Sequence, residues 1–95
     1  MPTYIIADIQ VTDPASYDQY RPLAAASIAR SGGRFVVRGG KIDLLEGAPE
    51  PERIVAIEFP DADTARRWYS SEEYQKALKI RQSASRGRVF LVEGA

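Results

Sequence analysis

The chain has 95 residues, so we expect one domain over residues 1–95 and no second domain. Thirteen basic side chains balance thirteen acidic ones without forming a basic stripe, which excludes nucleic acid as an expected partner. Cysteine and histidine are both absent, which excludes disulfides, Ser-His and Cys-His catalysis, His-ligated haem and the common zinc sites. We therefore expect no metal and no cofactor.

The first element that the sequence predicts is a central β-strand over Thr3–Val11, because this run is rich in β-branched residues. Alternation places one residue set on each face of the sheet, and the carboxylate of Asp8 falls among apolar neighbours. Neither a secretory signal nor an apolar run of about eighteen residues is present, so we expect no membrane association. A cytoplasmic location is the simplest expectation.

A helix is predicted next, beginning after the cap Asp13 and Pro14 and ending near Arg30 before a glycine pair. Its narrow apolar stripe consists of Tyr17, Tyr20, Ala24 and Ile28. Pro22 lies within this span and lacks a backbone donor, which predicts a kink or a restart of the helix.

The following residues allow two interpretations. Arg34–Arg38 and Lys41–Glu46 both have strand character, and Gly39-Gly40 between them is typical either of a two-residue hairpin turn or of a bulge in one long bent strand. The sequence does not decide between these two. Residues 47–52 are polar and rich in proline, which predicts an exposed loop.

The second half of the chain begins with a predicted strand over Arg53–Phe59. Asp61 is the expected cap of a short helix, and Ser70 with Glu73 predicts a capping box for a second helical piece. One side of that piece is formed by Tyr74, Ala77, Leu78 and Arg81. Arg86-Gly87 should end it before a last strand, Arg88–Glu93.

Two strand-helix-strand units in succession predict an α+β fold of the ferredoxin-like βαββαβ type. In this fold a four-stranded antiparallel sheet carries its helices on one face and leaves the other face uncovered. Two uncovered apolar faces can bury each other, so we expect a homodimer that packs sheet face to sheet face.

Several short motifs point to a known family. They are Gly32–Gly40, Leu45–Gly47, Pro51–Arg53, Ile57–Pro60, Trp68–Tyr74 and Val92–Gly94. Together they closely resemble the uncharacterised domain-of-unknown-function family thirteen-thirty, of the dimeric α+β barrel superfamily. The resemblance spans nearly the whole chain and implies the ferredoxin-like fold and a homodimeric barrel, but no established activity. Wider relatives include cofactor-free monooxygenases and muconolactone isomerases, whereas the haem-binding relatives use a histidine that this chain lacks.

Two carboxylates are the candidate catalytic groups. Asp8 and Glu58 fall on strands that should be neighbours, and two carboxylates close together can separate their pKa values and act as acid and base. The alternative is that they lie at the rim of the sheet or pair with Arg34, Arg38 or Arg53.

Three other side chains are candidates for ligand binding. Tyr17 and Trp68, with further aromatic residues of the two helical regions, are placed to line a pocket for an aromatic ligand between helices and sheet, or simply to fill the core. Arg38 beside a flexible glycine pair is suited to hold an anionic group, or else it is a charged edge residue that prevents strand addition.

Two functions therefore remain open. One is a dimeric module that binds a small hydrophobic, aromatic or anionic ligand in the cleft between sheet and helices. The alternative is a cofactor-free enzyme, monooxygenase-like or isomerase-like, in which Asp8 or Glu58 acts as the base and Arg38 holds an anionic substituent. Carboxylates that point into a cleft near Tyr17 would favour the enzyme, and carboxylates paired with arginines would favour the module.

Overall fold

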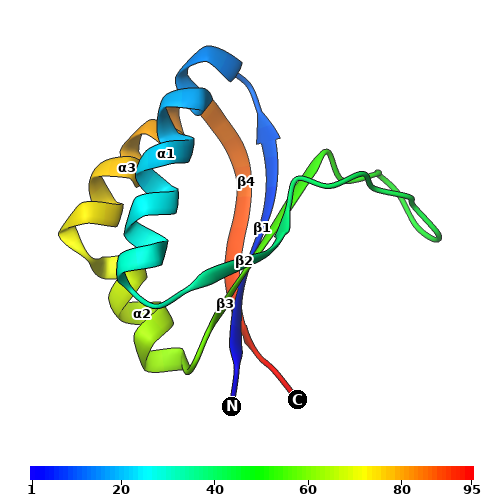
Figure 1. The fold of residues 1–95 in the computed structure, drawn as a ribbon. Coiled ribbons are helices and arrows are strands. Elements are labelled where there is room, and N and C mark those ends of the chain that lie inside the picture. The colour runs from blue at the N-terminus through cyan, green and yellow to red at the C-terminus, as the bar shows by residue number, and fades with distance from the viewer.

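The computed structural model describes all of residues 1–95 and contains four strands and three helices (Figure 1). In chain order the elements are β1 (Thr3–Val11), α1 (Pro14–Arg30), β2 (Arg34–Arg38), β3 (Arg53–Phe59), α2 (Ala62–Ser70), α3 (Glu72–Ala84) and β4 (Ser85–Glu93). The strands pair antiparallel in the order β2-β3-β1-β4, and the helices lie on one face of the sheet. The predicted ferredoxin-like α+β fold is confirmed, with its second helical region divided into α2 and α3.

The first two elements form where the sequence predicts them. Asp13 caps α1 by accepting hydrogen bonds from the backbone and the hydroxyl of Ser16, at 3.3 and 2.9 Å. The helix continues through Pro22 as a single element, so the predicted restart is wrong. Pro22 is exposed, so the carbonyl left without its N–H donor lies on the side of the helix that water can reach.

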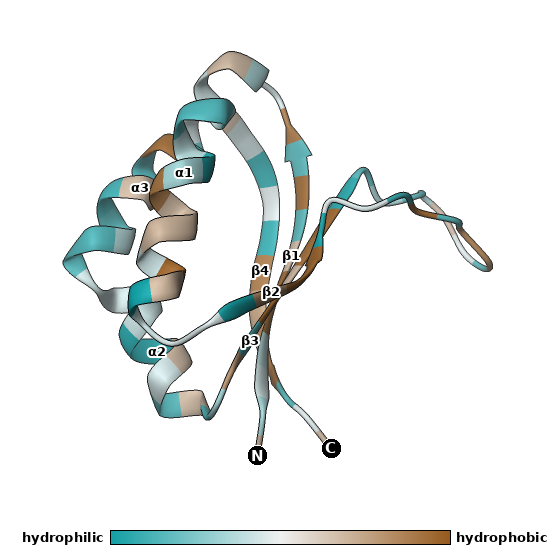
Figure 2. Ribbon diagram, viewed as in Figure 1, coloured by the Kyte–Doolittle hydropathy of each residue, from teal (hydrophilic) through white to brown (hydrophobic).

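The hydrophobic core lies between the inner face of the sheet and the helices. Trp68 is its centre: the indole ring lies 4.1 Å from the ring of Tyr74 and 5.4 Å from that of Phe59, measured between centroids. The indole N–H donates to the hydroxyl of Ser27 at 3.0 Å, so this buried donor is satisfied. Figure 2 shows the hydrophobic colour concentrated in the middle of the sheet.

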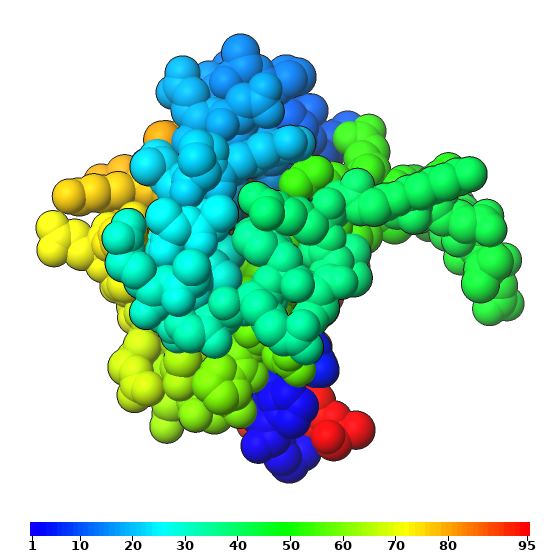
Figure 3. All heavy atoms as spheres, in the orientation of Figure 1, coloured from blue at the N-terminus to red at the C-terminus, as the bar shows by residue number.

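Residues 39–52 form one long loop, called the arm below, that projects from the body of the molecule (Figure 3). Lys41–Glu46 is not a strand, so both the hairpin and the long bent strand are wrong. The register shift in β2 lies instead between Phe35 and Val37. Gly39 adopts a positive φ of 67° and directs the chain away from the sheet, so the outer edge of β2 stays without a partner strand.

The start of α3 also differs from the prediction. The cap is Ser71, whose hydroxyl oxygen accepts from the N–H of Tyr74 at 3.2 Å, whereas Ser70 is the last residue of α2. Glu73 turns outward and forms a salt bridge of 2.8 Å with Arg30 on α1. The cap therefore lies one residue later than predicted, and the capping box does not form because the carboxylate of Glu73 joins two helices instead.

The end of α3 lies earlier than expected. The helix stops at Ala84, and Arg86-Gly87, predicted to be the breaker, already belongs to β4. The carbonyl of Ala84 accepts from the N–H groups of Thr12 and Asp13 at 2.9 and 3.0 Å. These bonds replace the helical ones that the last turn loses, so α3 passes directly into the strand.

The position of the α3 cap gives a first prediction. Ser71→Ala should lower the free energy of unfolding by about 0.5–2 kcal/mol, because it removes the acceptor for a free N–H group at the helix start. Ser70→Ala, one residue earlier, is the matched control and should change stability much less. Urea denaturation of both variants measures the difference, and equal losses would contradict the assigned cap.

Candidate functional site

A small cavity of about 40 Å³ lies between the inner face of the sheet and the helices. Seventeen residues line it; thirteen are hydrophobic or aromatic, and the other four are Arg21, Arg38, Arg53 and Arg81. No acidic residue is among them. The three residues that the sequence suggested for ligand binding, Tyr17, Arg38 and Trp68, all line this cavity.

Tyr17 of α1 is buried and lies between two arginines. Its hydroxyl accepts a hydrogen bond from Nε of Arg53 at 3.3 Å, which answers the need of a buried hydroxyl for a partner. The guanidinium carbons of Arg21 and Arg53 lie 5.6 and 5.5 Å from the ring centre, within cation–π range. Gly39 lies against the guanidinium of Arg53, where a side chain would collide with it. Contacts with Tyr17 and Gly39 thus fix the position of the Arg53 guanidinium beside the cavity.

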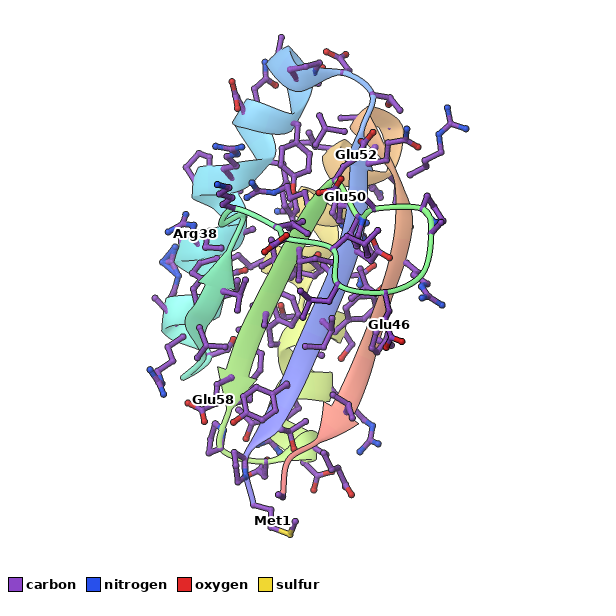
Figure 4. The ribbon with its side chains drawn as sticks, turned by 90° about the vertical axis from the view of Figure 1, so that its right-hand side faces the viewer. Met1, Arg38, Glu46, Glu50, Glu52 and Glu58 are labelled. Carbon is purple, nitrogen blue, oxygen red and sulfur yellow. The ribbon has the colours of Figure 1, made fainter.

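Arg38 of β2 lies at the edge of the sheet (Figure 4). It is opposite Val55 in the β2-β3 register, which places its side chain on the inner face. The guanidinium carbon lies 4.2 Å from the ring centre of Phe35. Arg38 is exposed and forms no salt bridge, so its charge is available at the opening of the cavity.

Deeper in the cavity, the hydroxyls of Tyr20 and Tyr74 are hydrogen-bonded to each other at 2.9 Å. Burial raises the pKa of Tyr20 well above its ordinary value, and the neighbouring Tyr74 raises it further. Arg81 of α3 lies beside these hydroxyls and is only 8 % exposed. The sequence predicted that Arg81 shares a helix side with Tyr74, but it gave no reason to place a charged group in the interior.

Asp8 and Glu58 do not belong to this cavity. Both lie on the open face of the sheet, because their neighbours in sequence, Ala7 and Ile57, face the helices. In the β1-β3 register Glu58 is opposite Tyr4, four positions from Asp8, which is a separation of about 13 Å along the strand. Of the two alternatives that the sequence left open for these carboxylates, the close acid–base pair does not fit this separation.

Each carboxylate instead has an arginine partner. Glu58 forms a salt bridge of 2.6 Å with Arg34, and Asp8 lies 3.9 Å from Arg88. Figure 4 shows Glu58 near the end of the sheet where Met1 lies. The pair of Glu58 with Arg34 is one that the sequence offered as the alternative to acid–base chemistry, whereas Arg88 was not foreseen as the partner of Asp8.

Two open depressions adjoin the cavity. A groove of about 450 Å³ between α2 and β4 shares Ile5 and Val89 with it. A polar cleft of about 250 Å³ at the junction of α3 and β4 shares Arg81 and Val89 with it. Arg81 thus lies between the cavity and the polar cleft.

No three side chains of the metal-binding types Asp and Glu gather into a group that would hold an ion. None of the helices combines the length and the apolar character needed to cross a bilayer.

The sheet and the helices on its inner face define a protein of the ferredoxin-like α+β class. The protein of unknown function RPA0582 from Rhodopseudomonas palustris has a similar structure, with a TM-score of 0.82 and 18% identity over 99% of this chain and 82% of that one. SnoaB, a cofactor-independent oxygenase from Streptomyces nogalater, is also similar, with a TM-score of 0.69 and 21% identity. The match covers 99% of this chain and 93% of SnoaB. Rv0793 from Mycobacterium tuberculosis has a TM-score of 0.61 and 18% identity, and the match covers 100% of this chain and 96% of Rv0793.

The chain belongs to the family described as Domain of unknown function (DUF1330), whose model matches residues 2–95. No curated protein matches it significantly. The identities to the solved structures are low, so those likenesses establish the fold and leave the function to be argued from the site.

The raised pKa of Tyr20 gives a second prediction. A phenol whose pKa is higher in the folded state contributes stability in full below the unfolded pKa of about 10, and this contribution is lost as the pH rises above that value. The free energy of unfolding should therefore fall above pH ~10, and less steeply in Tyr20→Phe. Urea denaturation at several alkaline pH values measures the slopes, with Tyr69→Phe at an exposed ring as the control. Identical slopes for Tyr20→Phe and the wild type would contradict the prediction.

Proposed function

We propose that the protein binds a small aromatic or hydrophobic ligand in the cavity between its sheet and helices. The observation that carries this proposal is the lining of the cavity, in which aromatic and aliphatic side chains are combined with four arginines and no acid. Apolar walls with a few convergent polar groups are the usual composition of a small-molecule site. Rings of Tyr17, Trp68 and Tyr74 offer surfaces against which an aromatic ligand can pack.

The size of the cavity determines how a ligand would enter. A volume of about 40 Å³ accommodates one or two water molecules, so an aromatic ring requires that side chains move. Arg21 and Arg38 line the cavity and are exposed, so they are free to move without disturbing the core. The groove beyond Val89, at about 450 Å³, lies within the usual size range of ligand pockets. Displacement of Val89 would join the two spaces.

The positions of the carboxylates favour binding over the enzyme that the sequence left open. A general base must reach the proton that it removes, directly or through one water. Asp8 and Glu58 lie on the opposite face of the sheet from the cavity and are paired with arginines. A ligand in the cavity would therefore meet cations and phenols but no carboxylate.

Ligand binding gives a third prediction. Trp68 is the only tryptophan and lines the cavity, so small aromatic acids, quinols and lactones that enter should change its fluorescence and raise the melting temperature. Ala7→Val adds two methyl groups to the cavity wall and should weaken this binding.

Ala29→Val, on the exposed surface of α1, is the matched control and should bind as the wild type does. A panel of such compounds that leaves both the fluorescence and the melting temperature of the wild type unchanged would overturn the proposed function.

We also propose that the open face of the sheet binds a second copy of the chain. Phe90 and Val92 of β4 are 44 % and 46 % exposed on this face, next to Ile6 of β1. The acids on the face are already paired with arginines of the same chain, so two copies would not repel each other. The arm, whose Leu45 is 87 % exposed, projects to the same side, where a partner would cover it (Figure 1). Two equal apolar faces favour a two-fold dimer.

The dimer gives a fourth prediction. Phe90→Glu places a charge in the centre of the proposed interface and should convert the dimer to a monomer, as measured by sedimentation equilibrium. Leu23→Glu introduces the same charge at an exposed residue of α1 and should leave the mass unchanged. A wild-type protein that is monomeric at all concentrations would contradict this proposal.

A further inference from the structure

Arg81 is the only charged residue in the buried interior. It lies on the inner side of α3 with Tyr74, Ala77 and Leu78, and its side chain is among those that are almost fully enclosed. No acidic group lies within salt-bridge distance of its guanidinium. Its Nε is buried and has no hydrogen-bond partner.

A largely buried cation without an acidic partner is energetically unfavourable, since it has lost part of its hydration and gained no opposite charge; the hydroxyl of Tyr74 beside it is neutral. Burial alone lowers the pKa of Arg81, but Tyr74, Tyr20 and Tyr69 raise it by more. The guanidinium is therefore charged at every physiological pH, whereas phenols become negative only above pH ~10. At neutral pH the tyrosines beside Arg81 supply dipoles and no negative charge.

Other arginines of the same molecule have a structural role because they form salt bridges. Arg30 and Arg34 form salt bridges of 2.8 and 2.6 Å with Glu73 and Glu58, and each pair joins two elements. Arg81 has the greater need of a counter-charge because it is buried, yet its guanidinium is paired with no acid and has only neutral hydroxyls beside it. No ion pair of the free protein explains its place in the interior.

The position of Arg81 gives a ligand access to it. The side chain separates the cavity from the polar cleft, and it lines both. The other polar residues of the cleft are Gln82, Ser85 and the exposed Arg86, and none is acidic. At about 250 Å³, the cleft admits water and small polar groups to the vicinity of the guanidinium. An anion would meet only favourable charge along this route.

We propose that the cavity ligand is an aromatic carboxylate and that Arg81 binds its carboxylate group. This assignment deepens the proposed function and rests on it for the aromatic part of the ligand, which would lie against Trp68 and Tyr74. A carboxylate matches the planar fork of a guanidinium through two parallel hydrogen bonds, and the unpartnered Nε is one donor of such a fork. The ligand supplies the counter-charge that the free protein lacks.

Matched ligand pairs test the assignment directly. Benzoate and benzamide, and 2-naphthoate and 2-naphthamide, are nearly equal in shape and differ in charge. Wild-type protein should bind each acid about ten- to a hundredfold more tightly than its amide, as expected for a charge-assisted hydrogen bond. The fluorescence of Trp68 reports the dissociation constants.

Arg81→Met separates a binding role from a structural one. Methionine retains the apolar stem and removes the charge, so the ligand-free variant should melt several degrees higher than the wild type while it loses the preference for the acid. Binding of the amides should stay close to the wild-type value. Arg81→Gln, a second neutral variant, should lose the same preference, and Arg86→Met at the exposed side of the cleft should retain most of it.

The possible failures are distinguishable. If the wild type binds acid and amide equally, the role of Arg81 is overturned and the proposed function stands. If the wild type binds neither the acid nor the amide of either pair, the role of Arg81 and the proposed function are both overturned. A preference for the acid that survives in Arg81→Met, or a lower melting temperature of that variant, would show that Arg81 is part of the framework and overturn the assignment.

Discussion

The aromatic stack of Phe59, Trp68 and Tyr74 holds the helices to the sheet, and the position of the cavity depends on it. Each ring comes from a different element, namely β3, α2 and α3, and the indole N–H adds a hydrogen bond to Ser27 of α1. Four elements thus meet at one side chain. Because Tyr74 is fixed in this stack, the rest of its helix side is fixed too, and Arg81, two turns later, must point into the interior. Two residues of the aromatic stack, Trp68 and Tyr74, thus stabilise the core and also line the cavity.

The alternation of β-strands separates the charges of this protein into two environments. Residues one position apart face opposite sides of the sheet, so Asp8 and Glu58 lie on the open face while their neighbours face the helices. Arginines are found on both sides, but acids are absent from the lining of the cavity. This arrangement leaves the interior able to attract and orient an anion and unable to remove a proton with a carboxylate. The separation follows from strand periodicity and register alone.

Local patterns in the sequence were enough to predict most elements, and properties that depend on distant residues were not. The bounds of β1, α1 and β3 follow from alternation, helix caps and turn residues, all of which act over a few positions. Lys41–Glu46 has the composition of a strand, and the outer edge of β2 is free, but the chain turns away from the sheet at Gly39 and the segment pairs with no strand. Similarly, the adjacency of the strands carrying Asp8 and Glu58 was predicted correctly, whereas their register, which sets the distance between the carboxylates, was not visible.

Arg81 shows how far the candidate site could have been predicted. A charged residue at the end of the apolar helix side formed by Tyr74, Ala77 and Leu78 was visible in the sequence. Such a residue either extends its charge to water or finds a partner inside, and thirteen acids along the chain were available as partners. Only the packed structure shows that the acids lie elsewhere and that the guanidinium is enclosed. A folded protein tolerates one such unfavourable charge if the rest of its core is well packed, and a charge of this kind gives a ligand of opposite sign a large advantage over a neutral one.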